Sequence, residues 1–131
     1  MRKVTRQIIQ AWARGDSLTL GNTSTNGEAI WLHGNPIAWK TGDDDVIALT
    51  LCGWNTVTTR ERLNGILHLK GAGYRFAQRD WKPVLLFKDL VIEIYEHETI
   101  YFSITQEPFA KSTVSRIVDY RDVKERQTSR A

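Results

Sequence analysis

The chain has 131 residues, of which 41% are hydrophobic, enough to bury one sizeable core but not two. Its net charge of +3 is mildly basic, which permits a nucleic-acid partner but excludes the strongly cationic class of histone-like proteins. Cys52 is the only cysteine, which excludes an intramolecular disulfide and indicates a reduced thiol packed in a strand.

The N-terminal segment predicts a short amphipathic helix. Four apolar side chains recur at helical spacing between residues 3 and 14, namely Val4, Ile8, Ile9 and Trp12, and Gly15 stands where such a helix would end. We expect this helix to cover one face of a sheet. The alternative is that its basic side meets phosphate or an acidic partner.

Residues 16–52 predict strands joined by tight turns. An edge strand containing Leu18 and Leu20 precedes a turn at Asn26-Gly27. A three-stranded meander then follows, with turns at Gly34-Asn35-Pro36 and 41–44. Apolar residues occupy both alternating sets between residues 45 and 52, so we expect this strand to be central.

A helix is predicted over residues 58–70. Thr58 and Glu61 have the spacing of a capping box, and Gly71 to Gly73 would end the helix. One apolar stripe, formed by Leu63, Ile66 and Leu67, would pack on the sheet. The opposite face would present Glu61, Asn64 and His68, with Arg60 and Arg62 on its flanks.

The rest of the chain predicts further strands. Residues 74–81 alternate, with Tyr74 and Phe76 on one side and the basic residues on the other, and Pro83 would stop this strand. A second hairpin is expected between residues 90 and 104, while residues 111–123 suit a helix or a strand. We therefore expect a single α+β domain over residues 1–123, with an antiparallel, mostly meander-type sheet, and a disordered tail over residues 124–131.

Charges come in blocks along the chain. The net charge is +4 for residues 1–15, −4 for 16–57, +4 for 58–82, −4 for 83–110 and +3 for 111–131. If helix 58–70 and strand 74–81 share a surface, it would bind nucleic acid through Arg60, Arg62, Lys70, Arg75, Arg79 and Lys82, with Trp81 or Trp54 stacked on an unpaired base. The alternative is that these cations form ordinary solvated faces paired with the acidic hairpins.

Five tryptophans are a rich supply for this length. Trp31, Trp39 and Trp54 lie in or beside apolar strands, so we expect them in the core. Trp12 and Trp81 have charged neighbours and are expected to be exposed anchors for a protein partner. As an alternative to binding nucleic acid, the chain would act as a modulator of a partner protein through these anchors or through its acidic segments. A homo-oligomer is compatible with either role.

No catalytic, cofactor or metal signature is recognisable. The three histidines, His33, His68 and His97, are far apart in the sequence, and residues 43–45 lack the downstream glutamate of a calcium loop. No nucleophile motif accompanies the possible acid–base pairs. No segment has the roughly 18 apolar residues of a membrane span or the pattern of a signal peptide. We expect a non-enzymatic cytoplasmic protein with no cofactor, no metal and no membrane partner.

Several short motifs between residues 21 and 67 resemble one class of proteins. They are Gly21-Asn22-Thr23, Leu32-His33-Gly34-Asn35 with Ile37-Ala38, Trp54-Asn55-Thr56 with Thr58-Thr59, and Leu63-Asn64. In these motifs the chain resembles small proteins of uncharacterised function encoded by bacteriophages and mobile elements. The resemblance implies an accessory protein of the host cytoplasm that handles nucleic acid or inhibits a host protein. It implies no catalytic residues.

Overall fold

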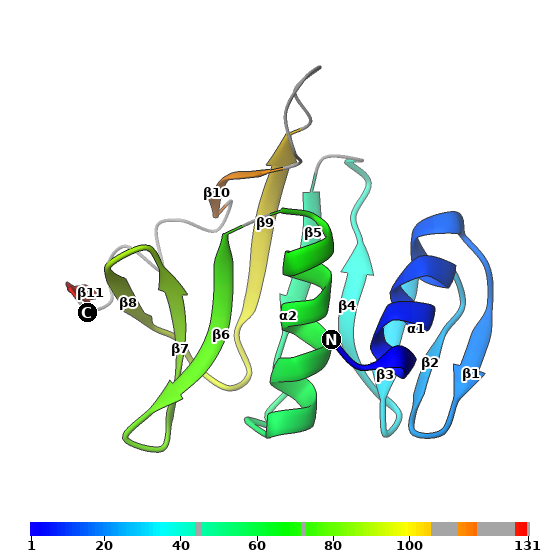
Figure 1. Ribbon diagram of the computed structural model, residues 1–131, viewed down its shortest axis with the longest axis horizontal. Helices are drawn as coiled ribbons and strands as arrows, with labels where there is room; N and C mark the ends of the chain where they lie inside the picture. Colours follow the sequence, from blue (N-terminus) through cyan, green and yellow to red (C-terminus); the bar gives the residue numbers. More distant parts are fainter. Residues whose placement is uncertain (44–45, 72, 106–112, 118–127, 131) are drawn as a thin grey trace.

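Two helices lie in front of the larger of two antiparallel sheets, and the second helix runs beside the edge strand of the smaller sheet, as Figure 1 shows. The computed structural model describes residues 1–43, 46–71, 73–105, 113–117 and 128–130. In spatial order, the larger sheet contains β1 (Leu18–Leu20), β2 (Thr23–Thr25), β3 (Ala29–Leu32), β4 (Asn35–Lys40), β5 (Val46–Thr50), β9 (Thr99–Thr105) and β10 (Thr113–Ile117). The smaller sheet contains β11 (Thr128–Arg130), β8 (Leu90–Glu93), β7 (Lys82–Phe87) and β6 (Tyr74–Arg79). The helices are α1 (Lys3–Arg14) and α2 (Val57–Leu69), so the predicted α+β class is confirmed.

The predicted meander is present as β3, β4 and β5. Its first turn consists of His33 and Gly34, both in the left-handed region (φ 51° and 80°), which matches the twist of a tight hairpin. Pro36 lies inside β4, opposite Trp31, where the register of the β3–β4 pair shifts. The predicted central strand is confirmed, because β5 pairs with β4 and β9 and is buried from Ile47 to Thr50.

The prediction of a second hairpin between residues 90 and 104 is wrong. β8 pairs with β7 and β11, whereas β9 crosses to the larger sheet and pairs with β5 and β10. Alternation of apolar residues indicates which side chains are buried, but it does not indicate the neighbouring strand. The predicted stop at Pro83 is wrong, because Pro83 is the second residue of β7 and lies opposite Gln78 of β6.

Helix α1 has the predicted bounds and ends at Gly15 (φ 79°), but its tryptophan is not an exposed anchor. Trp12 is 1% exposed, and its indole N–H donates a hydrogen bond to the carbonyl oxygen of Glu28 (2.8 Å). The prediction for Trp54 is also wrong: this side chain was expected in the core, but it is 57% exposed. Trp31 and Trp39, also expected in the core, are half-buried. Trp81 is exposed as predicted.

The N-cap of helix α2 lies two residues before Thr58, the predicted start of the capping box. Thr56 is the N-cap, and its hydroxyl oxygen accepts a hydrogen bond from the backbone N–H of Thr59 (3.1 Å). The box is wrong because Glu61 is hydrogen-bonded to α1 instead of the α2 start. The predicted apolar stripe of Leu63, Ile66 and Leu67 is fully buried.

Both sheets and both helices contribute to one hydrophobic core. Phe102 of β9 meets two aromatic rings of β6 edge-on, with centroid distances of 5.5 Å to Tyr74 and 6.3 Å to Phe76.

Residues 113–117, predicted as helix or strand, form β10, and the described part of the predicted tail, 128–130, pairs with β8. Residues 111–112, 118–127 and 131 lie outside the described residues. In the part of the chain that is described, no helix is long and apolar enough to cross a membrane.

Candidate functional site

A groove of about 700 Å³ runs between α2, β6 and the start of α1. Three arginines line it, one from each element: Arg6, Arg60 and Arg75. His68 is exposed in the same groove, and Glu61 is its only acidic lining residue among those described. Residues from three distant parts of the sequence therefore form one positively charged concave surface.

Asn64 fixes α2 onto β6 and thereby sets the width of this groove. β6 is the edge strand of the smaller sheet, so its outer peptide groups have no strand partner. The side-chain amide of Asn64 donates to the carbonyl oxygen of Phe76 (2.9 Å) and accepts from its backbone N–H (2.7 Å). One amide therefore satisfies both backbone groups of Phe76 and holds the helix against the strand.

Neutral groups hold Arg60 in place. Its guanidinium donates to the carbonyl oxygen of Asn55 (3.2 Å), the side-chain oxygen of Asn55 (2.6 Å) and the side-chain oxygen of Gln78 (3.3 Å). The amide of Asn55 also donates to Gln78 (3.1 Å). Because amide oxygens carry no net charge, Arg60 is oriented without losing its positive charge to a carboxylate.

Arg75 and Arg79 are exposed on β6, as the alternation of this strand predicts. No ion pair joins Arg60, Arg75 or Arg79 to a carboxylate among the residues placed in the structure. Trp81 follows in the β6–β7 turn, where Asp80 and Trp81 both have positive φ (51° and 66°). This turn leaves the Trp81 ring 87% exposed.

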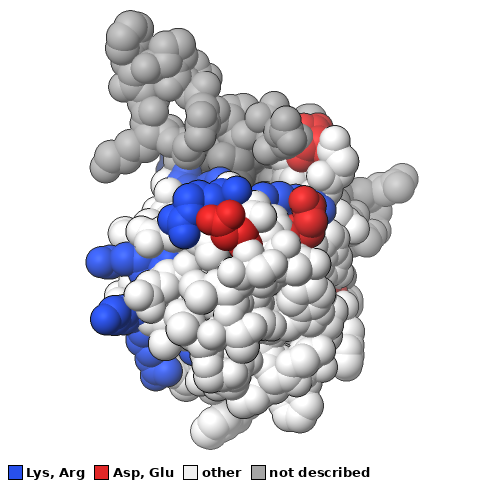
Figure 2. All heavy atoms as spheres, turned by 90° about the vertical axis from the view of Figure 1, so that its right-hand side faces the viewer, with Lys and Arg blue, Asp and Glu red and all other residues white. Residues whose placement is uncertain are grey.

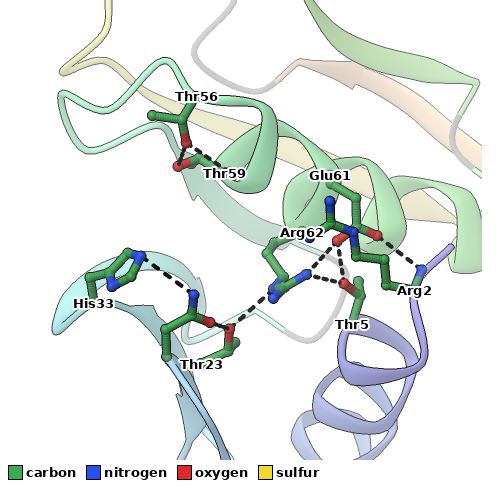
Figure 3. A network of polar contacts seen from close by, with 9 residues as sticks. Arg2, Thr5, Thr23, His33, Thr56, Thr59, Glu61 and Arg62 are labelled. Carbon is green, nitrogen blue, oxygen red and sulfur yellow. Dashed lines mark hydrogen bonds and ion pairs between the residues drawn. The ribbon is translucent and has the colours of Figure 1, made fainter.

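Arg62 does not belong to the basic surface, contrary to the prediction. It is 6% exposed and joins three elements, as Figure 3 shows. Its guanidinium donates to the hydroxyls of Thr23 in β2 (3.1 Å) and Thr5 in α1 (2.7 Å) and to the carboxylate of Glu61 (2.5 Å). Arg62 therefore stabilises the packing of α1, α2 and β2 and is not available to a ligand.

Glu61 completes this network, and its negative charge is paired with the positive charge of Arg62. It accepts hydrogen bonds from the hydroxyl of Thr5 and from the backbone N–H of Arg2 (3.2 Å). Burial by itself would raise the pKa of Glu61. The hydrogen bonds from Thr5, Arg2 and Arg62, with the charge of Arg62, outweigh burial, so the pKa of Glu61 lies below its ordinary value.

Lys70 is also separated from the predicted patch. It lines a different cavity, next to Trp12 and Lys40, at the opposite end of α2 from Arg60.

Figure 2, which looks onto the β1 side of the molecule, shows positive side chains projecting from the border on which the helices lie. Below a mixed group of positive and negative residues, the centre of that face is free of charged side chains.

The structure thus brings together part of the predicted set. Arg60 and Arg75 share the groove, with Arg79 further along β6, while Arg62 and Lys70 lie elsewhere. The sequence did not identify Arg6 as a groove residue. It also missed Asn55 and Gln78, which meet only because α2 packs on β6, and no local pattern signals that pair.

Polar groups that could perform other chemistry are dispersed. In the described ranges, no three histidine, cysteine or acidic side chains come together in a way that could hold a metal ion. Cys52 is a half-buried free thiol in the turn after β5 rather than in the strand itself, with φ 52°. On α2, Glu61 is bound to Arg62 and His68 is exposed.

Comparisons with known proteins bear on the origin of the chain. No curated protein and no solved structure matches it. The family model described as Kyanoviridae Gp96 protein matches residues 1–114, which include both helices, the groove and the motifs between residues 21 and 67. This agrees with the resemblance to phage-encoded proteins. The chain therefore belongs to the Kyanoviridae Gp96 protein family, a family of cyanophage proteins.

Proposed function

We propose that this phage protein binds nucleic acid in the groove between α2 and β6, without catalysing a reaction. The observation that supports the proposal is the convergence of Arg6, Arg60 and Arg75 on one concave surface whose single described carboxylate, Glu61, is paired with Arg62. Uncompensated arginines on a concave surface attract the phosphate backbone and displace its counterions. Such a protein would act in the cytoplasm of the infected cell.

The hydrogen bonds of the groove favour this role over that of ordinary solvated charges. Arg60 is held by Asn55 and Gln78, so little side-chain entropy is lost when a phosphate binds it. Arg79 and Trp81 extend the surface beyond the groove along β6 and its turn. A backbone that follows this strand would meet Arg75 and then Arg79.

The salt dependence of binding tests the proposal. Arg75→Gln removes one phosphate contact, so the slope of log affinity against log salt should become shallower by about 0.7 to 0.9, and affinity at low salt should fall for every sequence tested. Fluorescence anisotropy of a labelled oligonucleotide at several salt concentrations measures both quantities.

Arg14→Gln is the matched control, because it removes the same charge from a residue that is 62% exposed and paired with Asp16 at the far end of α1. It should leave the slope almost unchanged. Equal effects of both substitutions, or no oligonucleotide binding at low salt, would contradict the proposal.

A protein partner is the second candidate, favoured by Trp81. A tryptophan that is 87% exposed at the tip of a turn is the kind of side chain that fills a pocket on a partner. An apolar interface of this kind would respond weakly to salt. A purified protein that binds with salt-independent affinity and is lost on Trp81→Ala, with Arg75→Gln neutral, would favour this candidate.

A further inference from the structure

We propose that a second cavity, beside Trp54, receives one unpaired nucleobase, so that the ligand is single-stranded. This inference rests on the proposed function and names its substrate class. The cavity has a volume of about 440 Å³ and lies between the β3–β4 turn and the start of α2. That volume is within the range of about 300–1,000 Å³ typical of small-molecule sites.

The walls of the cavity suit a flat heteroaromatic ring. Its floor is apolar and consists of Leu32, Ile37 and Leu51, each less than 5% exposed. Trp54 forms one side and is 57% exposed, so a face of its indole remains available for stacking. No charged side chain lines the cavity among the residues described, which argues against a phosphate or a carboxylate as the group that enters it.

The rim can recognise the polar edge of a base. His33 comes from the β3–β4 turn, Asn35 is the first residue of β4, and Thr58 lies in the first turn of α2. The hydroxyl of Thr56, the N-cap, is hydrogen-bonded to Thr59. Figure 3 shows His33 and Thr56 on opposite sides of this region. Amide, imidazole and hydroxyl groups supply both donors and acceptors, which is what the edge of an unpaired base requires and an aliphatic ligand does not.

Neighbouring residues of the chain line the cavity and the basic groove at the start of α2. Thr56 lines the cavity and Val57, the next residue, lines the groove. Asn55, which orients Arg60, directly follows Trp54. In the proposed complex, a strand whose phosphate contacts Arg60 passes the start of α2, and one of its bases enters the cavity beside Trp54.

A duplex would not use this site without disruption. In a duplex, both faces of each base are stacked and its pairing edge is occupied, so entry would require the base to be flipped out, at a cost of a few kcal/mol. A single strand presents its bases already unpaired, and stacking on an aromatic ring contributes to the affinity for every base.

The test compares one labelled single strand with the duplex of the same sequence at fixed salt, measured by anisotropy. The single strand should bind more tightly. Trp54→Ala should weaken its binding roughly 5- to 150-fold, as expected for loss of one stacked base, and should leave duplex binding and the salt slope unchanged. Trp54→Phe should retain most of the affinity, because a ring remains.

An exposed aromatic residue that does not line the cavity, Tyr95, provides the matched control: Tyr95→Ala should leave single-strand affinity unchanged. An oligonucleotide without bases should bind wild type and Trp54→Ala equally. The base site would be overturned if single strand and duplex bound equally, or if Trp54→Ala had no effect on single-strand binding. In either case, the effect of Arg75→Gln on the salt slope would still test the groove. Absence of all oligonucleotide binding would overturn both proposals.

Discussion

Burial decides what each charged residue of α2 contributes. Arg60 and Arg62 are two positions apart, so they point to different sides of the helix. Arg60 faces the groove and neutral amides, whereas Arg62 faces α1 and β2 and binds Glu61. One cation is available to a ligand, and the other stabilises the contact between helices.

The acid sensitivity of the protein follows from Glu61. Its pKa in the folded state lies below its ordinary value, so its ionised form stabilises the fold. This stabilisation is complete above the ordinary glutamate pKa of about 4.3. It is lost as the pH falls through the lower pKa of the folded state. Urea unfolding at several pH values should therefore show a decrease in the free energy of unfolding across this acidic window.

Glu61→Gln should flatten that decrease, since glutamine does not titrate. Other carboxylates contribute equally to both proteins, so the difference between their pH profiles isolates Glu61. Parallel profiles for wild type and variant would show that the network around Arg62 does not depend on the Glu61 charge.

At the scale of elements, the close approach of the two helices depends on Gly65. A Cβ atom at this position would lie 2.5 Å from Cγ2 of Thr5 and 3.1 Å from Cδ1 of Ile9, both on α1. Real Cβ contacts are longer, so any side chain at this position forces α1 away from α2. Displacing α1 would also stretch the hydrogen bonds of Thr5 with Glu61 and Arg62.

We therefore expect Gly65→Ala to destabilise the protein by about 1–3 kcal/mol, as overpacking of a core does, although alanine favours helix formation. Urea unfolding measures the change. Gly42→Ala is the control, because a Cβ atom at Gly42 meets nothing within 4 Å and its φ is not in the left-handed region. A Gly65→Ala protein as stable as wild type would show that the helices can separate without loss.

At the scale of the molecule, β9 joins the two sheets into one unit. It follows β8 of the smaller sheet along the chain but pairs with β5 of the larger one. Its Phe102 is fully buried and contacts the aromatic rings of β6. A core shared in this way predicts that both sheets unfold together in one cooperative transition.

Phe102→Ala tests that cooperativity. Removing a buried phenylalanine ring leaves a cavity, so the free energy of unfolding should fall by about 3–5 kcal/mol. Trp81→Ala, at an exposed site, should change it by less than about 0.5 kcal/mol. Far-ultraviolet circular dichroism and tryptophan fluorescence should give the same midpoint for each protein. Two separate transitions would indicate that the sheets are independently stable.

Local patterns in the sequence were enough to predict most of the helices and strands. Apolar spacing predicted α1 and the buried stripe of α2, and the alternation around Ile47 predicted the central strand. These features depend on contacts between residues close in sequence or on which face of an element is apolar. Both follow directly from the spacing of residue types along the chain. The resemblance to phage proteins depended on motifs of the same local kind.

Long-range packing, by contrast, sets which elements are neighbours and which side chains reach solvent. The pairing of β9 with β5, the burial of Arg62 and Trp12, and the exposure of Trp54 all depend on distant segments. A charged or aromatic residue has the same local preference whether it faces a core or a ligand. Its environment comes from the packing of other elements against it, and for that physical reason the basic groove was predicted only in part.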